Sequence, residues 1–490
     1  MGLWPVWPTA WLCLAPLWYA VQTAPSRREA GLAALSWGLG YHGTVLVWVL
    51  HLHPLTWLGI PWLASVAIAI GVYLAVSLWG AGIAVVWALA LVSLQRQLSA
   101  GPLGQLLLGT TLWCSVEGLW SLSPLYWSSI ALTQSPGNLV IVHLARLSGY
   151  LGVTAALAAV NGLVAQALAA MGDASGRQRA GRWLAAALAL ALACHALGWG
   201  LYRQPLGDLE SEALQVGLIQ GNIPTREKLT SDGIKQARQL YLSGYRQLAT
   251  AGAELVLTPE GALPELWRPR RSPFVEAVQQ QQVPLLLGTF TRAPTRSFYL
   301  YQSLVAIAHS QGPARQYNKI KLVPLGEYIP LQSVLGGVID RLSPIGTNML
   351  PGDQPVPIDT GAGLAAAGIC YDSAYSWIFR HQVRAGGQFI VTASNNDPYP
   401  PRMMAQHHGQ DVLQAVATDR WAARVTNTGL SAIVDPHGHS RWMSVPQTYG
   451  AHLGTIYRRD RLTPYIRWGN WLLPLLWLVV AGYFIQIRPI

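Results

Sequence analysis

Three residues that could together perform acyl transfer occur in the second half of the chain, each near the end of a strand-like run. Glu260 follows the apolar run Leu255–Leu257, Lys319 lies in Tyr-Asn-Lys-Ile-Lys, and Cys370 directly follows the run Gly363–Ile369. A carboxylate can accept the proton of a thiol, and an ammonium can lower the pKa of a thiol and stabilise an oxyanion. A thiol can then hold an acyl group as a thioester. The trio therefore indicates acyl transfer in two steps through Cys370.

Each of the three residues also has a common structural interpretation. A cysteine after an apolar strand is usually a small core residue, a Pro-Glu-Gly sequence is usually a surface turn, and a loop lysine is usually solvated. Cys370 is the only one of four cysteines outside hydrophobic, membrane-type sequence. One cysteine cannot form a disulfide within that region, so cysteine usage does not identify the compartment.

The composition divides the chain into two regions. Of 490 residues 51% are apolar and only 11% are charged, whereas soluble proteins average about 25% charged. From Met1 to Tyr202 there is no Lys, and there are seven Arg and three acidic residues. The part that follows is charged like a globular domain, and its roughly 260 residues can bury one full core. We therefore predict a membrane bundle over 1–202, a catalytic domain over 203–467, and a last span with its tail over 468–490.

Apolar runs long enough to cross a bilayer, about 20 residues each, recur through the first region. The predicted spans lie near 5–22, 30–50, 59–93, 103–121, 138–171, 180–202 and, at the C-terminus, 468–487. Two of them, 59–93 and 138–171, are longer than a bilayer requires and are expected to tilt or to extend beyond the lipid. The first run follows no basic segment and precedes no clear cleavage site, so it is not interpreted as a signal peptide.

The distribution of arginine predicts the orientation. Arginines occur in the loops at 23–29, 94–102 and 172–182, whereas the loops at 51–58 and 122–137 contain no Lys or Arg. Since basic loops face the cytoplasm, the domain after Tyr202 is expected on the periplasmic face. Two charged residues, Glu117 and Arg146, lie within or beside spans, and they are either functional or paired to fix helix packing.

Strand-like runs and amphipathic helical stretches alternate in the second region. The strand-like runs are Leu214–Ile219, Glu254–Thr258, Pro284–Phe290, Phe298–Ala308, Leu364–Ile369, Phe389–Thr392, Ala422–Thr426 and Leu430–Val434. The helical stretches lie near 227–251, 272–281, 374–385 and 403–420. This alternation predicts an α/β sandwich whose active residues lie at strand ends and in loops.

Several other classes of function find less support. The net charge of +11 could suggest nucleic acid, but no stripe of basic and aromatic residues accompanies it. His407 and Asp411 would share a helix face, with His408 beside them, yet no third ligand of the kind zinc requires is evident nearby. A transporter would need an internal repeat or a pair of broken helices, and neither is obvious. We therefore predict no metal, no cofactor and no nucleic-acid partner.

Longer phrases surround the three residues and make a specific set. They are Gln220-Gly-Asn-Ile-Pro224, Tyr317-Asn-Lys-Ile-Lys-Leu-Val-Pro-Leu-Gly-Glu-Tyr-Ile-Pro330, Cys370-Tyr371, Arg424-Val-Thr-Asn-Thr-Gly429 and Leu462-Thr-Pro-Tyr-Ile-Arg-Trp-Gly-Asn-Trp471. The order Glu, Lys, Cys resembles the nitrilase, or carbon–nitrogen hydrolase, superfamily. With a membrane bundle before it and one span after it, the set resembles the apolipoprotein N-acyltransferases of bacterial envelopes.

This resemblance implies an αββα nitrilase-like sandwich on a transmembrane bundle, and it implies roles for individual residues. Glu260 would be the general base, Lys319 the oxyanion-stabilising lysine and Cys370 the nucleophile. The supporting active-site residues would be Glu327, Tyr371 and Asp372, and the substrate-binding residues would be Leu229, Asn395 and Arg424.

The resemblance also implies the substrates and the location. The acyl donor would be a membrane phospholipid, and the acceptor would be the N-terminal amine of a diacylglyceryl apolipoprotein. The enzyme would be a multi-pass protein of the bacterial cytoplasmic (inner) membrane. Without a visible pairing motif, a monomer is expected.

The chain departs from the family pattern at four places. Its first span corresponds to the family's second, Cys-Tyr-Glu is Cys-Tyr-Asp372 here, and a typical Trp is replaced by Leu229. The family's Ser-Asn-Asp-Ala-Trp-Phe is Ser394-Asn-Asn-Asp-Pro-Tyr-Pro400 here. We expect the reaction to be kept and the substrate loops to differ.

Two alternatives remain open at this point. The same three residues would serve a membrane-anchored nitrilase-type amidase, in which water accepts the acyl group. The departures would also suit a non-catalytic membrane protein that binds lipids or lipoproteins through a decayed site.

Overall fold

The computed structural model describes residues 6–171, 176–294, 299–308, 315–324, 326–328 and 349–486. The chain forms two compact units. Unit 1 comprises Met1–Leu50, Ala67–Gln204 and Arg467–Ile490, and unit 2 comprises His51–Val66 and Pro205–Ile466. Two apolar segments that the sequence offers as lids toward the bilayer, Leu331–Val338 and Ser343–Leu350, lie outside the described residues except for 349–350.

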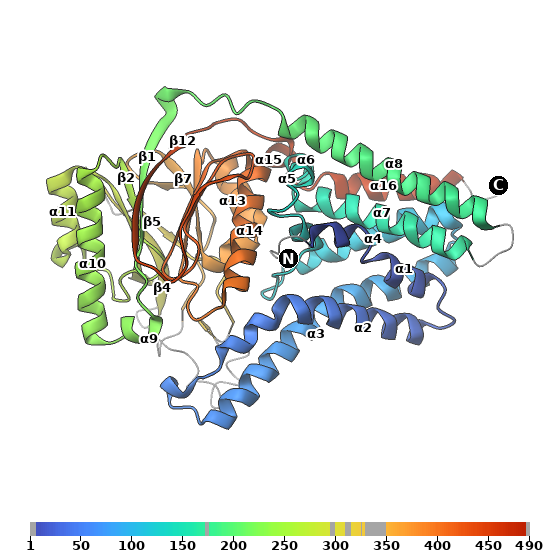
Figure 1. Cartoon of the computed structure of the whole chain (residues 1–490), viewed down its shortest axis with the longest axis horizontal. Helices are drawn as coiled ribbons and strands as arrows, with labels where there is room; N and C mark the ends of the chain where they lie inside the picture. Colours follow the sequence, from blue (N-terminus) through green and yellow to red (C-terminus); the bar gives the residue numbers. More distant parts are fainter. Residues whose placement is uncertain are drawn as a thin grey trace. The chain divides into compact units, whose positions relative to one another are not determined.

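Unit 1 is helical. Its elements are η1 (Trp7–Trp11), α1 (Ala15–Gln22), α2 (Arg27–Leu46), η2 (Val47–Leu52), α3 (Trp62–Gln97), α4 (Pro102–Trp120), η4 (Ile130–Thr133), α5 (Leu139–Val142), α6 (Ala145–Ser148), α7 (Tyr150–Ala170), α8 (Gly176–Tyr202) and α16 (Leu472–Gln486). Among the described residues, four helices are long and apolar enough to cross a membrane: Arg27–Leu52, Trp62–Gln97, Tyr150–Ala170 and Gly176–Tyr202. Figure 1 shows α7 and α8 side by side.

Two of the predicted spans are not continuous helices. The run 5–22 divides into η1 and α1, because the Asn161 side chain accepts hydrogen bonds from the backbone N–H groups of Leu14 and Ala15, both at 2.9 Å. The run 138–171 breaks at Gly149, where φ is +63°, a value that glycine adopts readily. Just before this break, the carbonyl of Leu147 accepts a hydrogen bond from the Trp471 indole at 2.7 Å. In both places a side chain from a distant segment satisfies the backbone that the break frees.

The intramembrane carboxylate Glu117 lies at the centre of a hydrogen-bond cluster in unit 1. It accepts hydrogen bonds from the Ile130 backbone N–H at 3.0 Å, from the Trp113 indole at 3.2 Å and from the Thr154 hydroxyl at 3.2 Å. These partners belong to α4, η4 and α7. Glu117 therefore joins three elements of the bundle by hydrogen bonds.

Unit 2 is a sandwich of two six-stranded sheets. The first sheet has the order β12-β1-β2-β3-β4-β5 and the second has the order β11-β10-β9-β8-β7-β6. The strands of the first sheet are β1 (Ala213–Gln220), β2 (Leu255–Leu257), β3 (Leu285–Arg292), β4 (Leu300–Ile307), β5 (Arg315–Asn318) and β12 (Gly450–Tyr457). Those of the second are β6 (Ile358–Asp359), β7 (Leu364–Ile369), β8 (Phe389–Ser394), β9 (Ala422–Thr426), β10 (Ala432–Val434) and β11 (Ser440–Met443).

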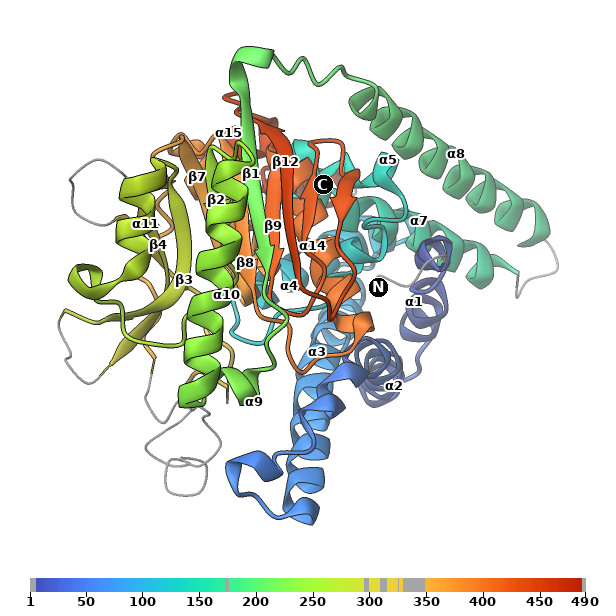
Figure 2. The ribbon, with the colours of Figure 1, turned by 60° about the vertical axis from the view of Figure 1, so that its left-hand side comes forward.

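The core of unit 2 lies between the sheets because alternate strand side chains face inward. Leu214, Val216 and Leu218 of β1 pack with Ala365, Ala367 and other buried residues of the second sheet. In the first sheet β1, β2 and β3 are parallel neighbours and β12 runs antiparallel to β1. Figure 2 shows β12, β1 and β2 side by side with α10 against them.

Helices cover both outer faces of the sandwich (Figure 1). The first sheet carries α10 (Ser231–Thr250) and α11 (Pro273–Gln281), and the second carries α13 (Ser376–Arg384) and α14 (Pro401–Thr418). The short elements are α9 (Thr225–Lys228), α15 (Pro464–Trp468), η3 (Thr56–Leu58), η5 (Glu210–Glu212), η6 (Pro269–Arg271) and η8 (Cys370–Ala374). The predicted α/β sandwich with an αββα arrangement is confirmed.

The structure adds four strands that the sequence did not predict. They are β5, β6, β11 and β12. β6 has two residues, and β12 reads Gly-Ala-His-Leu-Gly-Thr-Ile-Tyr, without a continuous apolar run. Such strands exist because a neighbour pairs with them, so local sequence gives little signal for them.

Candidate active site

The ends of four strands bring the candidate residues of unit 2 together. Glu260 lies three residues after β2, and Lys319 directly follows β5. Cys370 and Asn395 directly follow the parallel neighbours β7 and β8. Since the parallel strands β7 and β8 end at the same edge of their sheet, Cys370 and Asn395 lie close together, and Glu260 and Lys319 follow strands of the other sheet.

Lys319 is the centre of the site. Its side chain is completely buried, and its Nζ donates to Glu260 Oε1 at 2.8 Å and to Glu327 Oε1 at 2.5 Å. Its backbone is fixed on both sides, since its N–H donates to the Gln302 carbonyl and its own carbonyl accepts from Gly352 N–H, both at 2.8 Å. One ammonium therefore holds two carboxylates in fixed positions.

Both carboxylates are also held by backbone N–H groups. Glu260 Oε2 accepts from Asn395 N–H at 3.0 Å, and Glu327 Oε2 accepts from Val323 N–H at 2.8 Å. A close approach of the chain supports Glu260, because a Cβ at Gly288 would overlap the Pro259 carbonyl. Glu260 is thus oriented by two donors, one from each sheet.

Cys370 has an unusual backbone conformation. Its φ is +49°, a conformation that costs a non-glycine residue roughly 1–3 kcal/mol and persists only where the surroundings enforce it. Its carbonyl accepts a hydrogen bond from His407 Nε2 at 2.9 Å, and its thiol lies within the electrostatic influence of the Glu260 carboxylate. The side chain is half-buried, so it remains accessible. Strain at this position places the thiol at the exposed end of the strand.

The charges of the site act in opposite directions on the thiol. Burial raises the pKa of Cys370 above its ordinary value, and the carboxylates of Glu260 and Glu327 raise it further, whereas the Lys319 ammonium lowers it. Lys319 therefore lowers the pKa of the thiol, as predicted, but burial and the two carboxylates outweigh its effect. The resting thiol is neutral, and its proton is expected to leave only as it attacks.

The pKa values of Lys319 and Glu327 are shifted as well. Burial alone would lower the pKa of Lys319, but Glu260 and Glu327 raise it well above its ordinary value. Burial raises the pKa of Glu327, and Glu260 raises it further, although Lys319 opposes the shift. Lys319 is therefore a permanent cation in a pocket with two acidic groups.

Asp372 organises the backbone on both sides of the site. Its carboxylate is fully buried and accepts from Lys321 N–H at 2.7 Å, from the Tyr317 hydroxyl at 2.9 Å and from Ile369 N–H at 3.0 Å. Burial raises the pKa of Asp372 to about 6, and these donors oppose the rise. The shorter acid thus has a full set of partners, which ties the lysine loop to the strand that ends at Cys370.

A chain of buried side chains lies behind Cys370. Arg424 is fully buried, forms an ion pair with Asp411 and donates to Asn396 Oδ1 at 3.1 Å. Asn396 Nδ2 lies 3.0 Å from His407 Nδ1, and His407 Nε2 reaches the Cys370 carbonyl. Burial lowers the pKa of His407 well below its ordinary value, so the ring is neutral and the carbonyl requires its proton on Nε2. Arg424 therefore supports the backbone of the nucleophile from behind.

The remaining predicted residues lie around this centre. Tyr371 is buried beside Cys370, with its ring 5.2 Å from that of Tyr375. The Asn395 side chain donates to the Thr225 hydroxyl at 2.8 Å, and Leu229 is half-buried directly after α9. Leu229 and Asn395 therefore belong to neighbouring loops, since Asn395 contacts the first residue of α9.

Two residues near the site were not predicted. Tyr399 is half-buried, and its pKa is raised by burial and then by the charge of Cys370 and Glu327. Lys228 is a buried lysine four residues after Pro224, and it interacts electrostatically with Glu260 and Asp397. Tyr399 lies in the segment Ser394–Pro400, where the chain departs from the family pattern, but only the position of the two residues beside ionisable groups identifies them.

The metal hypothesis for α14 finds no support in the contacts. His407 and Asp411 bond to protein groups, and His408 Nε2 lies 2.8 Å from the Ser440 hydroxyl. Within the described part of the chain, no group of three His, Cys, Asp or Glu side chains could hold a metal ion.

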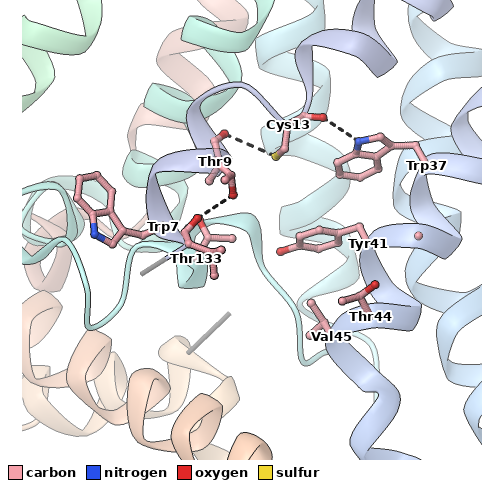
Figure 3. A pocket seen from close by; sticks show the side chains of 11 residues that line it. Trp7, Thr9, Cys13, Trp37, Tyr41, Thr44, Val45 and Thr133 are labelled. Atoms are coloured by element: carbon pink, nitrogen blue, oxygen red, sulfur yellow. Dashed lines mark hydrogen bonds between the residues drawn. The ribbon is translucent and has the colours of Figure 1, made fainter. Parts of the chain in front are cut away.

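Unit 1 contains a cavity of its own (Figure 3). It has a volume of about 430 Å³ and is lined by Val6, Trp7, Thr9, Ala10, Cys13, Trp37, Gly40, Tyr41, Thr44, Val45 and Thr133. The Cys13 thiol donates to the Ala10 carbonyl at 3.6 Å, and the Trp37 indole donates to the Cys13 carbonyl at 2.8 Å. None of these residues is one of the predicted site residues.

Comparisons with known proteins agree with this fold. The family model of carbon–nitrogen hydrolases matches residues 215–445, and that of the apolipoprotein N-acyltransferase N-terminal domain matches residues 3–163. Among solved structures, Nit3 of Saccharomyces cerevisiae, a nitrilase-superfamily member, matches with a TM-score of 0.40 and 14% identity over 50% of this chain and 90% of its own. The family model thus shows that residues 215–445 of unit 2 are similar to carbon–nitrogen hydrolases.

Curated relatives extend over nearly the whole chain. An apolipoprotein N-acyltransferase of a Nostoc species is 44% identical over 96% of this chain and 93% of its own length. One from Thermosynechococcus vestitus is 46% identical over 97% of this chain and 88% of its own length. The chain belongs to the apolipoprotein N-acyltransferase family. It is thus a membrane acyltransferase with a nitrilase-like domain.

Proposed function

We propose that this protein transfers an acyl chain from a membrane phospholipid, through a thioester on Cys370, to the N-terminal amine of a diacylglyceryl-cysteine lipoprotein. The observation that carries the proposal is the buried Lys319 ammonium, which bonds to both Glu260 and Glu327 beside that thiol. A general base, a permanent cation and an accessible thiol at one strand edge are the groups that acyl transfer requires. No cofactor is needed for this chemistry.

In the first half-reaction, Glu260 takes the proton of the Cys370 thiol as the sulfur attacks the ester carbonyl carbon of the donor. A C–S bond forms, and the carbonyl oxygen becomes an oxyanion that the Lys319 ammonium stabilises. The ester C–O bond then breaks, and Glu260 returns the proton to the departing oxygen. The products are the acyl-Cys370 thioester and a lysophospholipid.

In the second half-reaction, the lipoprotein amine attacks the thioester carbonyl carbon. Glu260 accepts a proton from the amine, a C–N bond forms and the C–S bond breaks. The thiolate regains a proton, which restores the resting site. The two half-reactions make a ping-pong cycle in which Lys319 stabilises both oxyanions.

The other site residues receive supporting roles in this proposal. Glu327 shares Lys319 with the base and fixes its position. Asp372 and Arg424 act as positioning residues, because each bonds to the backbone network around Cys370 rather than to a position open to substrate. Leu229 and Asn395 are proposed to border the substrate. Tyr371 is proposed to line the site beside the nucleophile.

The location follows from the same chemistry. Both substrates are lipids, so the catalytic unit has to work at a bilayer surface. The distribution of arginine in the loops favours the inner membrane with the catalytic unit on the periplasmic face. A monomer suffices, since every proposed catalytic group comes from one chain.

The test is mass spectrometry of the intact purified protein after incubation with phospholipid, beside Cys370→Ala. An acyl adduct that hydroxylamine removes, present only on the wild type and discharged by a diacylglyceryl peptide, is the expected result. Discharge by water at the same rate without the peptide would instead identify a hydrolase of the nitrilase type. Absence of an adduct with any phospholipid would refute the proposed donor.

A further inference from the structure

Lys228 is a buried cation without a partner among the residues that the structure describes. It is the last residue of α9, and its side chain is 3% exposed. Across the residues that the structure describes, its ammonium makes no hydrogen bond and no ion pair. A buried charge in this position is costly unless another group compensates it.

The other buried cations of unit 2 have partners. Lys319 bonds to two carboxylates, Arg424 pairs with Asp411, and Arg459 pairs with two aspartates. Arg420 donates to backbone carbonyls, among them that of Gly387 at 2.9 Å. Lys228 therefore differs from the cations whose role is structural, which suggests that its partner is a ligand.

The ammonium of Lys228 lies beside the general base. A Cβ atom placed on Gly261, the residue after Glu260, would lie 3.9 Å from Lys228 Nζ. Glu260 and Asp397 attract the ammonium, yet neither approaches within ion-pair distance. The cation thus faces the catalytic centre with its hydrogen-bond donors unused.

The position of Lys228 is fixed by the loop that orients the base. Thr225 N–H, at the start of α9, donates to Asp397 Oδ2 at 2.9 Å, and its hydroxyl accepts from the Asn395 side chain at 2.8 Å. Asn395 N–H in turn donates to Glu260. The distance between the ammonium and the base is therefore set by short bonds rather than by a flexible loop.

We propose that the Lys228 ammonium binds the phosphodiester group of the acyl donor and so recognises phospholipids in the first half-reaction. Of the two proposed substrates, only the donor carries a phosphate, and the reacting group of the acceptor is an amine that a cation repels. A charge-assisted hydrogen bond to a phosphate oxygen would satisfy the buried cation. This inference depends on the proposed function, because it assigns a residue to the proposed donor.

The electrostatic environment agrees with this role. Burial lowers the pKa of Lys228 to about 8, although Glu260 and Asp397 act to raise it. The ammonium is then mostly charged at neutral pH, and a bound anion would hold it in the charged form. An empty site is thus destabilised and a phosphate-filled site is compensated.

The test compares two acyl donors in thioester formation on Cys370, followed by mass spectrometry. One donor is phosphatidylglycerol, and the other is a p-nitrophenyl ester of the same acyl chain, which has no phosphate. In Lys228→Met the ratio of acylation rates, phospholipid over phenyl ester, should fall roughly 10- to 100-fold through a higher KM for the phospholipid. Lys228→Arg, which keeps a cation, should recover part of the ratio. Lys235→Met removes a lysine from the surface of α10 and should leave the ratio unchanged.

The outcomes separate this inference from the proposed function. Equal slowing of both donors in Lys228→Met would mean that the lysine acts on Glu260, and it would overturn phosphate recognition. A third outcome combines two observations: inorganic phosphate inhibits the phenyl-ester reaction only when Lys228 is present, and Lys228→Met leaves the KM for the phospholipid unchanged. This outcome would assign the lysine to free phosphate and overturn the headgroup assignment. If the wild type forms no thioester with phosphatidylglycerol, the proposed function itself fails. Lys228→Gln provides a second neutral variant if Lys228→Met does not fold.

Discussion

Replacing Asp372 tests whether one buried carboxylate holds the catalytic loops together. Its oxygens accept from Tyr317, Lys321 and Ile369 within 3.0 Å, and the residue has no exposed surface. In Asp372→Asn one oxygen becomes an amide nitrogen. The Tyr317 hydroxyl can turn and act as an acceptor, but at least one backbone N–H then loses its acceptor.

The expected loss of stability follows from the number of hydrogen bonds that the substitution breaks. A buried donor left without an acceptor costs about 1–3 kcal/mol. For a unit of this size, each kcal/mol lowers Tm by about 2–4 °C, so a cost of about 2 kcal/mol lowers Tm by roughly 6 °C. The freed N–H groups flank Lys319 and Cys370, and a displacement of about 1 Å costs roughly 100-fold in rate. Thioester formation should therefore slow by roughly 10- to 100-fold.

The pH dependence provides a second readout. Because burial raises the pKa of Asp372 to about 6, this carboxylate is protonated at a higher pH in the folded protein than in the unfolded chain. The stabilisation from Asp372 is therefore fully present below about pH 4 and is lost as the pH rises through 6. Relative to Asp372→Asn, the wild type should gain about 1 kcal/mol of unfolding free energy between pH 8 and pH 5.

The assays are thermal melting in detergent and the rate of thioester formation, with Asp353→Asn as the control. Asp353 is exposed, so its replacement should change neither measurement. Asp372→Glu should also lose stability, by about 1–3 kcal/mol, because the site has no room for another methylene. If Asp372→Asn matched Asp353→Asn in both Tm and rate, the idea that this carboxylate ties the two loops together would be wrong.

Three further predictions concern the cations and the histidine around the nucleophile. Lys319→Ala leaves two buried carboxylates without a cation, so alkylation of the Cys370 thiol by iodoacetamide should slow roughly 100-fold. Equal alkylation rates in Lys319→Ala and in the surface control Lys235→Ala would argue against an activating role of Lys319. His407→Phe removes the hydrogen-bond donor to the Cys370 carbonyl and should slow thioester formation roughly 10-fold. His381→Phe changes an exposed histidine of α13 and should leave the rate unchanged. Equal rates in the two variants would contradict the role of His407 in supporting the Cys370 backbone. Since the pKa of Lys228 is lowered to about 8 by burial, the phospholipid KM should rise as the pH increases through 8, and Lys228→Arg should flatten that rise; a pH-independent KM in the wild type would count against the ammonium.

Part of the candidate site could be predicted because its members follow apolar runs in the chain. The strand that ends before Cys370 has the bounds Leu364–Ile369 in both the prediction and the structure. An apolar run that a sandwich must bury also determines where the following residue emerges. The division between a charge-poor first part and a charged second part is likewise written in the composition, since a bilayer excludes charge.

Local patterns failed where distant partners decide the conformation. The break at Gly149 and the short strand β6 depend on neighbours far along the chain, so an apolar run or a two-residue segment does not reveal them. Arg424 looked like a substrate contact, but the structure buries it behind the nucleophile. The position of Arg424 in the sequence does not reveal whether its side chain points toward the substrate or behind the nucleophile.

The sequence by itself determined the catalytic residue types, their order and the nitrilase-like class, because a base, a lysine and a thiol in specific phrases are properties of the chain. Only the tertiary structure decided that one ammonium holds both Glu260 and Glu327, that Asp372 joins two loops, and that Lys228 lies near the base without a partner among the described residues. These are contacts between segments separated by as many as 59 residues, and they exist because two sheets pack their strand ends together. Burial then sets the protonation and the cost of each charge, which residue identity alone does not specify.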